Sequence, residues 1–257
     1  MKNLKESVSP KTGLLLLIIF VLLTVIMFAF TSLFSSEGFS DALAEQSDVE
    51  AVFIPQKEKR LTIIIDAGHG GEDPGAVVGD ICEKDINLLI AKKLEKLFSV
   101  GDYNVVMTRS EDNMLYNKGE EDKKKQYDLK NRADIAEDYE NVVFISIHMN
   151  KFYLNSCKGA QVFFSNNELS LSLAESIQSS IKLLQSDNNR VPKNGASTVY
   201  LLGRLKCPTV LVECGFLSNE RDASSLLDES YTDELSVLIY KGIIEWICEN
   251  ETSLCLR

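Results

Sequence analysis

The chain contains only two histidines, His69 and His148, and each one follows a run of apolar residues. Such runs are typical of buried strands, and two imidazoles at the ends of two buried strands suggest a metal site. Two carboxylates are placed in a similar way, because Glu83 opens a predicted helix and Glu213 ends a third apolar run. We therefore expect a zinc site with two imidazoles and one carboxylate, and a spare carboxylate that can move a proton of water.

Each of these residues also has a structural interpretation. A lone histidine at a strand end is usually structural, and Glu83 could simply stabilise its helix N-terminus through the dipole, an ambiguity shared by Asp85, the alternative ligand. Glu213 is harder to explain in this way, because a carboxylate within Val-Leu-Val-Glu-Cys-Gly-Phe-Leu is costly to bury unless it is paired or coordinated. Burial raises its pKa and nearby zinc lowers it, which suits a group that takes a proton from water and passes it to a leaving amine.

The composition indicates one globular catalytic domain. The 257 residues are 45% hydrophobic and 25% charged, which is enough for one sizeable core. The first 36 residues hold three lysines and one glutamate, a local charge of +2, which leaves −13 for the rest of a chain whose net charge is −11. This acidic body argues against a nucleic-acid partner, and any affinity for an anionic cell wall must come from specific contacts.

Residues 14–34 are uncharged and long enough to cross a membrane as a helix. Lysines precede this segment and acidic residues follow it, so we expect residues 1–13 in the cytoplasm and the catalytic domain outside the cytoplasmic membrane. Ala42-Leu43-Ala44 resembles a peptidase site, but the apolar run exceeds the usual signal core of about 7–15 residues, which favours an uncleaved anchor. A flexible stalk at 35–58, a catalytic domain at 59–250 and a tail at 251–257 complete the predicted organisation.

Six cysteines lie in the part of the chain that we expect to be exported, where disulfides can form. The sequence does not select a pairing, and the absence of Cys-x-x-Cys spacing argues against a thiolate zinc site. Cys82 and Cys214 adjoin Glu83 and Glu213, and we interpret both as small buried hydrophobes.

From Leu61 onward, predicted strands alternate with predicted helices. The pattern predicts strands at 61–65, 103–108, 142–147, 159–165, 199–202 and 209–213. It predicts helices at 83–98, 127–137, 169–184, 222–227 and 232–248, with a solvated charged stretch at 120–125. This alternation favours a single α/β domain with a mostly parallel twisted sheet and helices on both faces. His69, His148 and Glu213 then fall at the carboxyl ends of strands, where such sheets bind ligands.

Several motifs in combination carry a family resemblance that runs from about Leu61 to Cys248. They are Ile-Asp-Ala-Gly-His69-Gly-Gly-x-Asp73-x-Gly75-Ala76, Glu83-Lys84, Thr108-Arg109, Leu129-x-x-Arg132, Ser146-Ile-His148-x-Asn150 and Val212-Glu213-Cys-Gly-Phe-Leu-Ser-Asn219. This series resembles the zinc-dependent N-acetylmuramoyl-L-alanine amidases of peptidoglycan. The resemblance implies zinc bound by His69, Glu83 and His148, Glu213 as the catalytic glutamate, and substrate contact at Asn150. It also implies cleavage of the amide that joins the lactyl group of muramic acid to L-alanine of the stem peptide.

Within that family, a short chain with one anchor and no wall-binding repeats is similar to the sporulation members of endospore formers. That likeness implies a role in cortex maturation towards muramic δ-lactam, with the catalytic domain in the forespore intermembrane space. An accessory protein could deliver substrate or stabilise the metal site. Two other hypotheses are a zinc peptidase that cuts within the stem peptide and a catalytically silent peptidoglycan-binding scaffold.

Three further residues are candidates for supporting roles. Asp66 could orient the His69 imidazole or form a turn. Arg109 could bind a stem-peptide carboxylate as a fork, although a structural ion pair is the preferred interpretation. Met149 replaces a small residue of many family members and could alter how the peptide backbone is held.

Overall fold

The protein is described by a computed structural model that covers residues 60–255. The predicted cytoplasmic segment, anchor and stalk lie outside these residues and stay predictions. None of the helices within residues 60–255 combines the length and the apolar character that a membrane crossing requires. The last helix, α7 (Glu229–Cys255), extends into the segment predicted as a tail.

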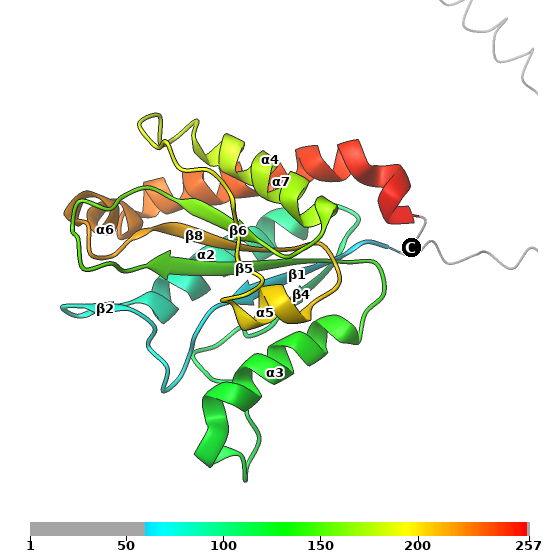
Figure 1. Cartoon of the computed structure of the whole chain (residues 1–257), viewed down its shortest axis with the longest axis horizontal. Coiled ribbons are helices and arrows are strands. Elements are labelled where there is room, and N and C mark those ends of the chain that lie inside the picture. Colours follow the sequence, from blue (N-terminus) through cyan, green and yellow to red (C-terminus); the bar gives the residue numbers. More distant parts are fainter. Residues whose placement is uncertain (1–59, 256–257) are drawn as a thin grey trace, which may run out of the picture. The chain divides into compact units, whose positions relative to one another are not determined.

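A six-stranded sheet forms the centre of the molecule, in the order β4-β1-β5-β8-β6-β7 (Figure 1). Its strands are β1 (Thr62–Ala67), β4 (Asn104–Met107), β5 (Val142–Asn150), β6 (Gln161–Phe164), β7 (Lys193–Asn194) and β8 (Thr209–Phe216). The first four strands in this order are parallel, whereas β6 runs antiparallel to β8 and β7 runs parallel to β6. The expected α/β domain is therefore confirmed, but its sheet is mixed.

Helices cover both faces of the sheet, as predicted. One face packs against α2 (Glu83–Phe98), α4 (Glu168–Ile181) and α7, and this side holds the larger core. The other face packs against α3 (Lys124–Glu137) and α5 (Tyr200–Arg204), over a smaller core (Figure 1). The alternation of side chains along β1 supplies both cores, because Ile63 and Ile65 face the first and Ile64 faces the second.

Most predicted elements are confirmed to within a few residues, with one clear error. Residues 199–202 were expected to form a strand, and they begin the short helix α5 instead. Leu201 and Leu205 lie one helical turn apart and both enter the smaller core, so burial of this face overrides the strand propensity of Val199 and Tyr200.

Shorter elements complete the described chain. A 3-10 turn (Glu121–Lys123) and helix α6 (Glu220–Leu226) lie near the predicted positions of the charged stretch and of a helix. The hairpin formed by β2 (Val77–Val78) and β3 (Ile81–Cys82) was not predicted, since its strands are too short to show a periodic pattern. This hairpin leads directly into Glu83, the first residue of α2.

Candidate metal centre

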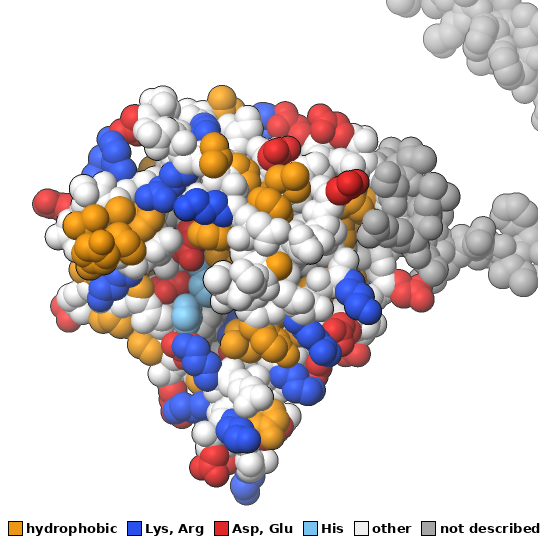
Figure 2. Space-filling view, viewed as in Figure 1, with side chains coloured by type: hydrophobic (Ala, Val, Ile, Leu, Met, Phe, Trp, Pro, Cys, Tyr) orange, Lys and Arg blue, Asp and Glu red, His pale blue; other side chains and the backbone are white. Residues whose placement is uncertain are grey.

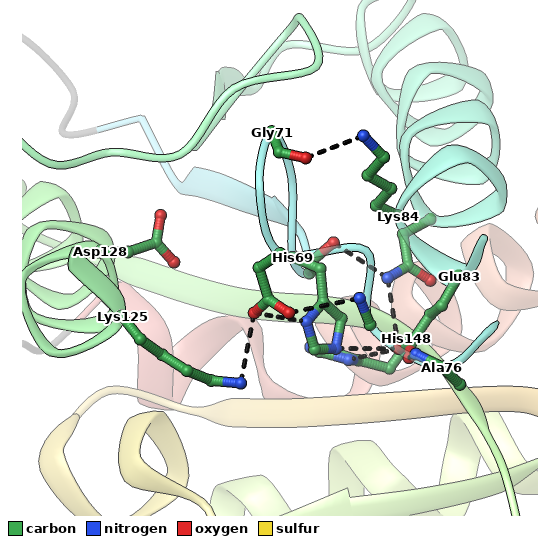
Figure 3. Close-up of polar contacts among 12 residues, drawn as sticks. His69, Gly71, Ala76, Glu83, Lys84, Lys125, Asp128 and His148 are labelled. Atoms are coloured by element: carbon green, nitrogen blue, oxygen red, sulfur yellow. Dashed lines mark hydrogen bonds and ion pairs between the residues drawn. The ribbon is translucent and has the colours of Figure 1, made fainter. Parts of the chain in front are cut away.

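Two imidazoles and one carboxylate converge at the carboxyl end of the sheet. His69 lies in the loop after β1, Glu83 begins α2, and His148 lies on β5. Glu83 Oε1 is 2.8 Å from His148 Nδ1 and 3.3 Å from His69 Nε2 (Figure 3). One ligand atom of each residue lies within 4.8 Å of the other two. The structure thus brings together the three residues that the sequence singled out as metal ligands.

Glycines allow this close approach. A Cβ on Gly68 would lie 2.2 Å from His148 Nε2, so the imidazole rests directly on the main chain at that position. A Cβ on Gly75 would lie 2.6 Å from Glu83 Oε2 and 2.7 Å from His69 Cδ2, and Gly75 also has a φ of 69°. Any larger residue at either position would displace a candidate ligand.

The Glu83 carboxylate is fixed by the main chain as well as by the histidines. Its Oε2 accepts a hydrogen bond from the Ala76 N–H at 2.8 Å, and its Oε1 accepts one from the Met149 N–H at 3.0 Å. Burial raises the pKa of Glu83, but hydrogen bonds to His148 and His69 outweigh this effect and the pKa is lowered. The carboxylate is therefore ionised, as a metal ligand must be. Asp85, the alternative ligand, is exposed on the first turn of α2.

Asp73, and not Asp66, orients the His69 ring. Asp73 Oδ2 lies 2.9 Å from His69 Nδ1, which leaves Nε2 directed at the candidate metal position. Asp66 instead accepts hydrogen bonds from Arg132, Ser146 and Thr108. Burial raises the Asp66 pKa, but the Arg132 charge and the hydrogen bonds from Ser146 and Thr108 outweigh this effect. The Asp66 pKa is therefore lowered. Because Asp66 lies within β1, the alternative turn-forming role is also wrong.

This donor set fits zinc. Two imidazole nitrogens and one ionised carboxylate oxygen are the ligands of many hydrolytic zinc sites, which keep one position for a reactant. The His69–Asp73 contact is the outer hydrogen bond that metal-bound imidazoles usually make.

Glu213 lies beside this cluster, on the strand next to His148. The two residues are register partners on β8 and β5. Glu213 Oε2 is buried and has no hydrogen-bond partner within residues 60–255. Burial, together with the nearby charge of Glu83, raises the Glu213 pKa to about 7, although His148 and His69 oppose the shift. A carboxyl group that titrates near neutral pH can both accept and return a proton.

Comparison with known proteins identifies the family of the chain. The sequence model of the N-acetylmuramoyl-L-alanine amidase family matches residues 63–245. The chain belongs to this family. The germination-specific N-acetylmuramoyl-L-alanine amidase of Bacillus subtilis (strain 168) is 33% identical over 193 residues, which cover 73% of this chain and 80% of that protein.

Solved structures of other amidases share the fold. The CwlD amidase from Clostridioides difficile, in complex with the GerS lipoprotein, superposes with a TM-score of 0.70 and is 39% identical, and the match covers 74% of this chain and all of that one. The catalytic domain of CwlV from Bacillus (Paenibacillus) polymyxa gives a TM-score of 0.63 at 27% identity, covering 73% of this chain and 98% of that one. This chain is thus an N-acetylmuramoyl-L-alanine amidase.

Arg109 is buried and contacts main-chain oxygens in the structure. The side chain is only 3% exposed, and it donates hydrogen bonds to the main-chain oxygens of Ala67, Gly68, Lys84 and Glu111. The guanidinium therefore ties the His69 loop to its surroundings. It forms no ion pair with a carboxylate of residues 60–255, so the preferred interpretation as a structural ion pair is wrong, and substrate contact by Arg109 stays a prediction.

Asn150 lies two residues beyond His148 on β5 and is half-buried, and its main-chain oxygen accepts a hydrogen bond from Leu217. Met149, between them, is 2% exposed and packs into the larger core, so its side chain points away from His148. The Met149 side chain therefore cannot shape the peptide-binding side of the amidase.

Two cysteines adjoin site residues. Cys214 is fully buried, and burial strongly raises the pKa of its thiol, which agrees with its interpretation as a small hydrophobe. Cys82 is only half-buried, because it lies in the β2–β3 hairpin rather than in the sheet. Both are free thiols, as are Cys157, Cys207 and Cys248.

Proposed function

We propose that this amidase binds Zn²⁺ through His69, Glu83 and His148, and that it uses Glu213 to cleave the amide between N-acetylmuramic acid and L-alanine of peptidoglycan stem peptides. One observation carries the proposal: the convergence of the two imidazoles and the Glu83 carboxylate within 4.8 Å, next to a carboxyl group whose pKa is raised to about 7. A catalytically silent scaffold has no need of an unpartnered buried carboxylate beside a metal site.

Each of the candidate site residues has a separate role in the proposed reaction. When bound, zinc supplies Lewis-acid chemistry that polarises the scissile carbonyl and makes water a stronger nucleophile at neutral pH. Glu213 takes the proton that the attacking water loses and passes it to the nitrogen of L-alanine as the C–N bond breaks. Asp73 keeps the His69 ring in the orientation that the ligand set requires. Asn150, on the same strand as His148, contacts the peptide backbone of the substrate.

We further propose that the amidase acts in spore cortex maturation towards muramic δ-lactam. The germination-specific relative and the CwlD amidase support this role by their similarity to the chain. The predicted anchor at 14–34 would hold the catalytic domain outside the cytoplasmic membrane, in the forespore intermembrane space. Normal δ-lactam in the cortex of a deletion strain would contradict the cortex role, and a shortened product starting at Glu45 would contradict the uncleaved anchor.

An accessory protein is part of the proposal, because the structure of the similar CwlD amidase is a complex with the GerS lipoprotein. The accessory protein would stabilise the metal site or deliver substrate. Full activity and full zinc retention by the purified chain alone would contradict it.

The decisive experiment is a digest of peptidoglycan by the purified full chain with added zinc, with the fragments identified by mass spectrometry. A Glu213→Gln variant is the control, since it has almost the same size and shape and cannot carry the proton. We expect free peptides with an L-alanine N-terminus from the wild type and none from the variant. Cleavage farther along the stem would indicate a zinc peptidase. No peptide release despite bound zinc would indicate a missing accessory protein or a scaffold.

A further inference from the structure

A row of three side chains crosses the sheet at the candidate site. His148 on β5 is the register partner of Glu213 on β8, and Glu213 is the register partner of Gln161 on β6. Directly opposite residues of an antiparallel pair project from the same face with Cβ atoms about 5 Å apart. Gln161 therefore extends the line of catalytic side chains by one strand.

Gln161, the last residue of this row, accepts a hydrogen bond from Arg190. Arg190 Nη1 donates a hydrogen bond to Gln161 Oε1 at 3.1 Å, and Arg190 Nε donates one to the Lys158 main-chain oxygen at 2.7 Å. The guanidinium carbon also lies 4.5 Å from the centre of the Phe216 ring. These contacts fix the plane of the guanidinium group and leave Nη2 without a hydrogen-bond partner within residues 60–255.

Arg190 differs from the other arginines of residues 60–255 because its charge is accessible and has no carboxylate partner. Arg132 contacts Asp66 and Asp128, while Arg60, Arg204 and Arg221 each contact one carboxylate. Arg109 is buried among main-chain oxygens. Arg190 is half-buried, and no ion pair within residues 60–255 involves it. Figure 2 shows both Lys or Arg and Asp or Glu side chains close to the two histidines.

We propose that Arg190 is a substrate-binding residue that recognises a carboxylate of the stem peptide, an inference that rests on the proposed function. From the cross-strand spacing and one hydrogen bond, the guanidinium lies on the order of 10 Å from the Glu213 carboxyl group. An extended peptide spans about 3.5 Å per residue, so this position is reached by a carboxylate about two to three residues beyond the scissile amide. A guanidinium whose plane is already fixed binds such a carboxylate with little further ordering.

The test compares two synthetic muramyl peptides that differ only in whether this stem-peptide carboxylate is free or amidated. The enzyme is the zinc-loaded full chain. We expect the wild type to have a KM about 10- to 100-fold lower for the free carboxylate, with a similar kcat for both peptides. Arg190→Gln should remove this preference by raising KM for the free carboxylate alone, and Arg190→Lys should restore part of it.

The control variant is Arg204→Gln, which removes the same charge from an exposed ion pair with Glu137 and should keep the preference. An equal rise in KM for both peptides in Arg190→Gln would overturn the inference, because a merely structural role acts on both. A wild type that cleaves both peptides equally well would also overturn it, whether or not the variants fold. A wild type that cleaves neither peptide, even when supplied with its accessory protein, would instead refute the proposed function, and the inference with it.

Discussion

His148 and Glu213 are register partners on the adjacent parallel strands β5 and β8. Neighbouring strands lie about 4.8 Å apart, so a candidate metal ligand and the proposed proton carrier are positioned by the hydrogen bonds of the sheet rather than by loops. The pairing of β5 with β8 therefore sets the separation between the two residues. Metal binding by His148 and proton transfer by Glu213 can therefore be tested by separate substitutions.

Replacement of Glu213 by Gln should abolish catalysis without loss of the metal. The amide keeps the shape of the carboxyl group but cannot accept the proton, so we expect peptide release to fall about 10²- to 10⁴-fold. The zinc content of the variant, measured by elemental analysis, should equal that of the wild type. Loss of zinc in the variant would instead assign Glu213 to the ligand set.

The same substitution should change how the stability of the zinc-free protein depends on pH. The Glu213 pKa of about 7 lies above its ordinary value of 4.5, so between these values the unfolded chain binds fewer protons than the folded one and stability falls as pH rises. The Glu213→Gln variant lacks this pH-dependent loss of stability. Its free energy of unfolding should exceed that of the wild type by up to about 3 kcal/mol at pH 8 and by almost nothing at pH 4. Urea unfolding with a chelator measures the difference.

The matched substitution for this pH series is Glu220→Gln, which removes a carboxylate on the exposed surface of α6. Its stability relative to the wild type should stay nearly constant from pH 4 to pH 8. If Glu213→Gln gives the same flat profile, the carboxyl group is not desolvated in the folded protein.

Two glycines provide a test of the space around the ligands. Gly75 and Gly79 both have a positive φ, at 69° and 59°, so replacement by Ala strains the backbone to a similar extent at each position. Only at Gly75 does the added Cβ meet Glu83 and His69, whereas at Gly79 it meets nothing within 4 Å. We expect Gly75→Ala to lose zinc and activity and Gly79→Ala to keep both. Equal zinc affinity in the two variants would contradict the close packing at Gly75.

Asp73→Asn should weaken zinc binding. The Asp73 carboxylate accepts a hydrogen bond from the His69 ring, and loss of such outer partners typically lowers metal affinity about 10- to 100-fold. Competition with a chromophoric chelator measures the affinity without reference to activity. Asp85→Asn, on the exposed side of the first turn of α2, should leave the affinity unchanged.

Arg132 should be essential for stability. The side chain is 1% exposed and forms ion pairs with Asp66 at 2.6 Å and with Asp128 at 2.8 Å, and it also donates to the main-chain oxygen of His69. Arg132→Met leaves two buried carboxylates without their partner, so we expect a loss of about 3–5 kcal/mol in chemical denaturation. Lys130→Met, which breaks an exposed pair with Asp134 on the same helix, should cost at most about 1 kcal/mol.

The proximity of His69, Glu83 and His148 could be predicted, because the sequence contains only two histidines, each at the end of an apolar run, and the family motifs include Glu83. The positions of most helices and strands could also be predicted. Core-facing residues such as Ile63 and Val143 recur at the spacing that their helix or strand requires. Both kinds of inference depend on residue type and local order alone.

Residues that act through long-range packing could not be predicted in this way. Arg109 and Arg132 are both arginines near strand β1, and only the fold shows that one contacts main-chain oxygens and the other contacts carboxylates. The Arg190 position depends on the antiparallel pairing of β6 with β8, which joins residues far apart in the sequence. Asp73 was detectable, because it follows His69 by four residues, but Asp66 was the nearer candidate.

The short outer strands of the sheet have a consequence for solubility. β4, at one edge, has four residues, and β7, at the other, has only two. Unpaired edge strands are templates on which a second chain can add a strand and begin to aggregate, and brevity is one of the ways in which natural proteins limit this. The sheet thus keeps its longest strands, β5 and β8, in the interior, where the main chain that positions the candidate site residues is not available for intermolecular pairing.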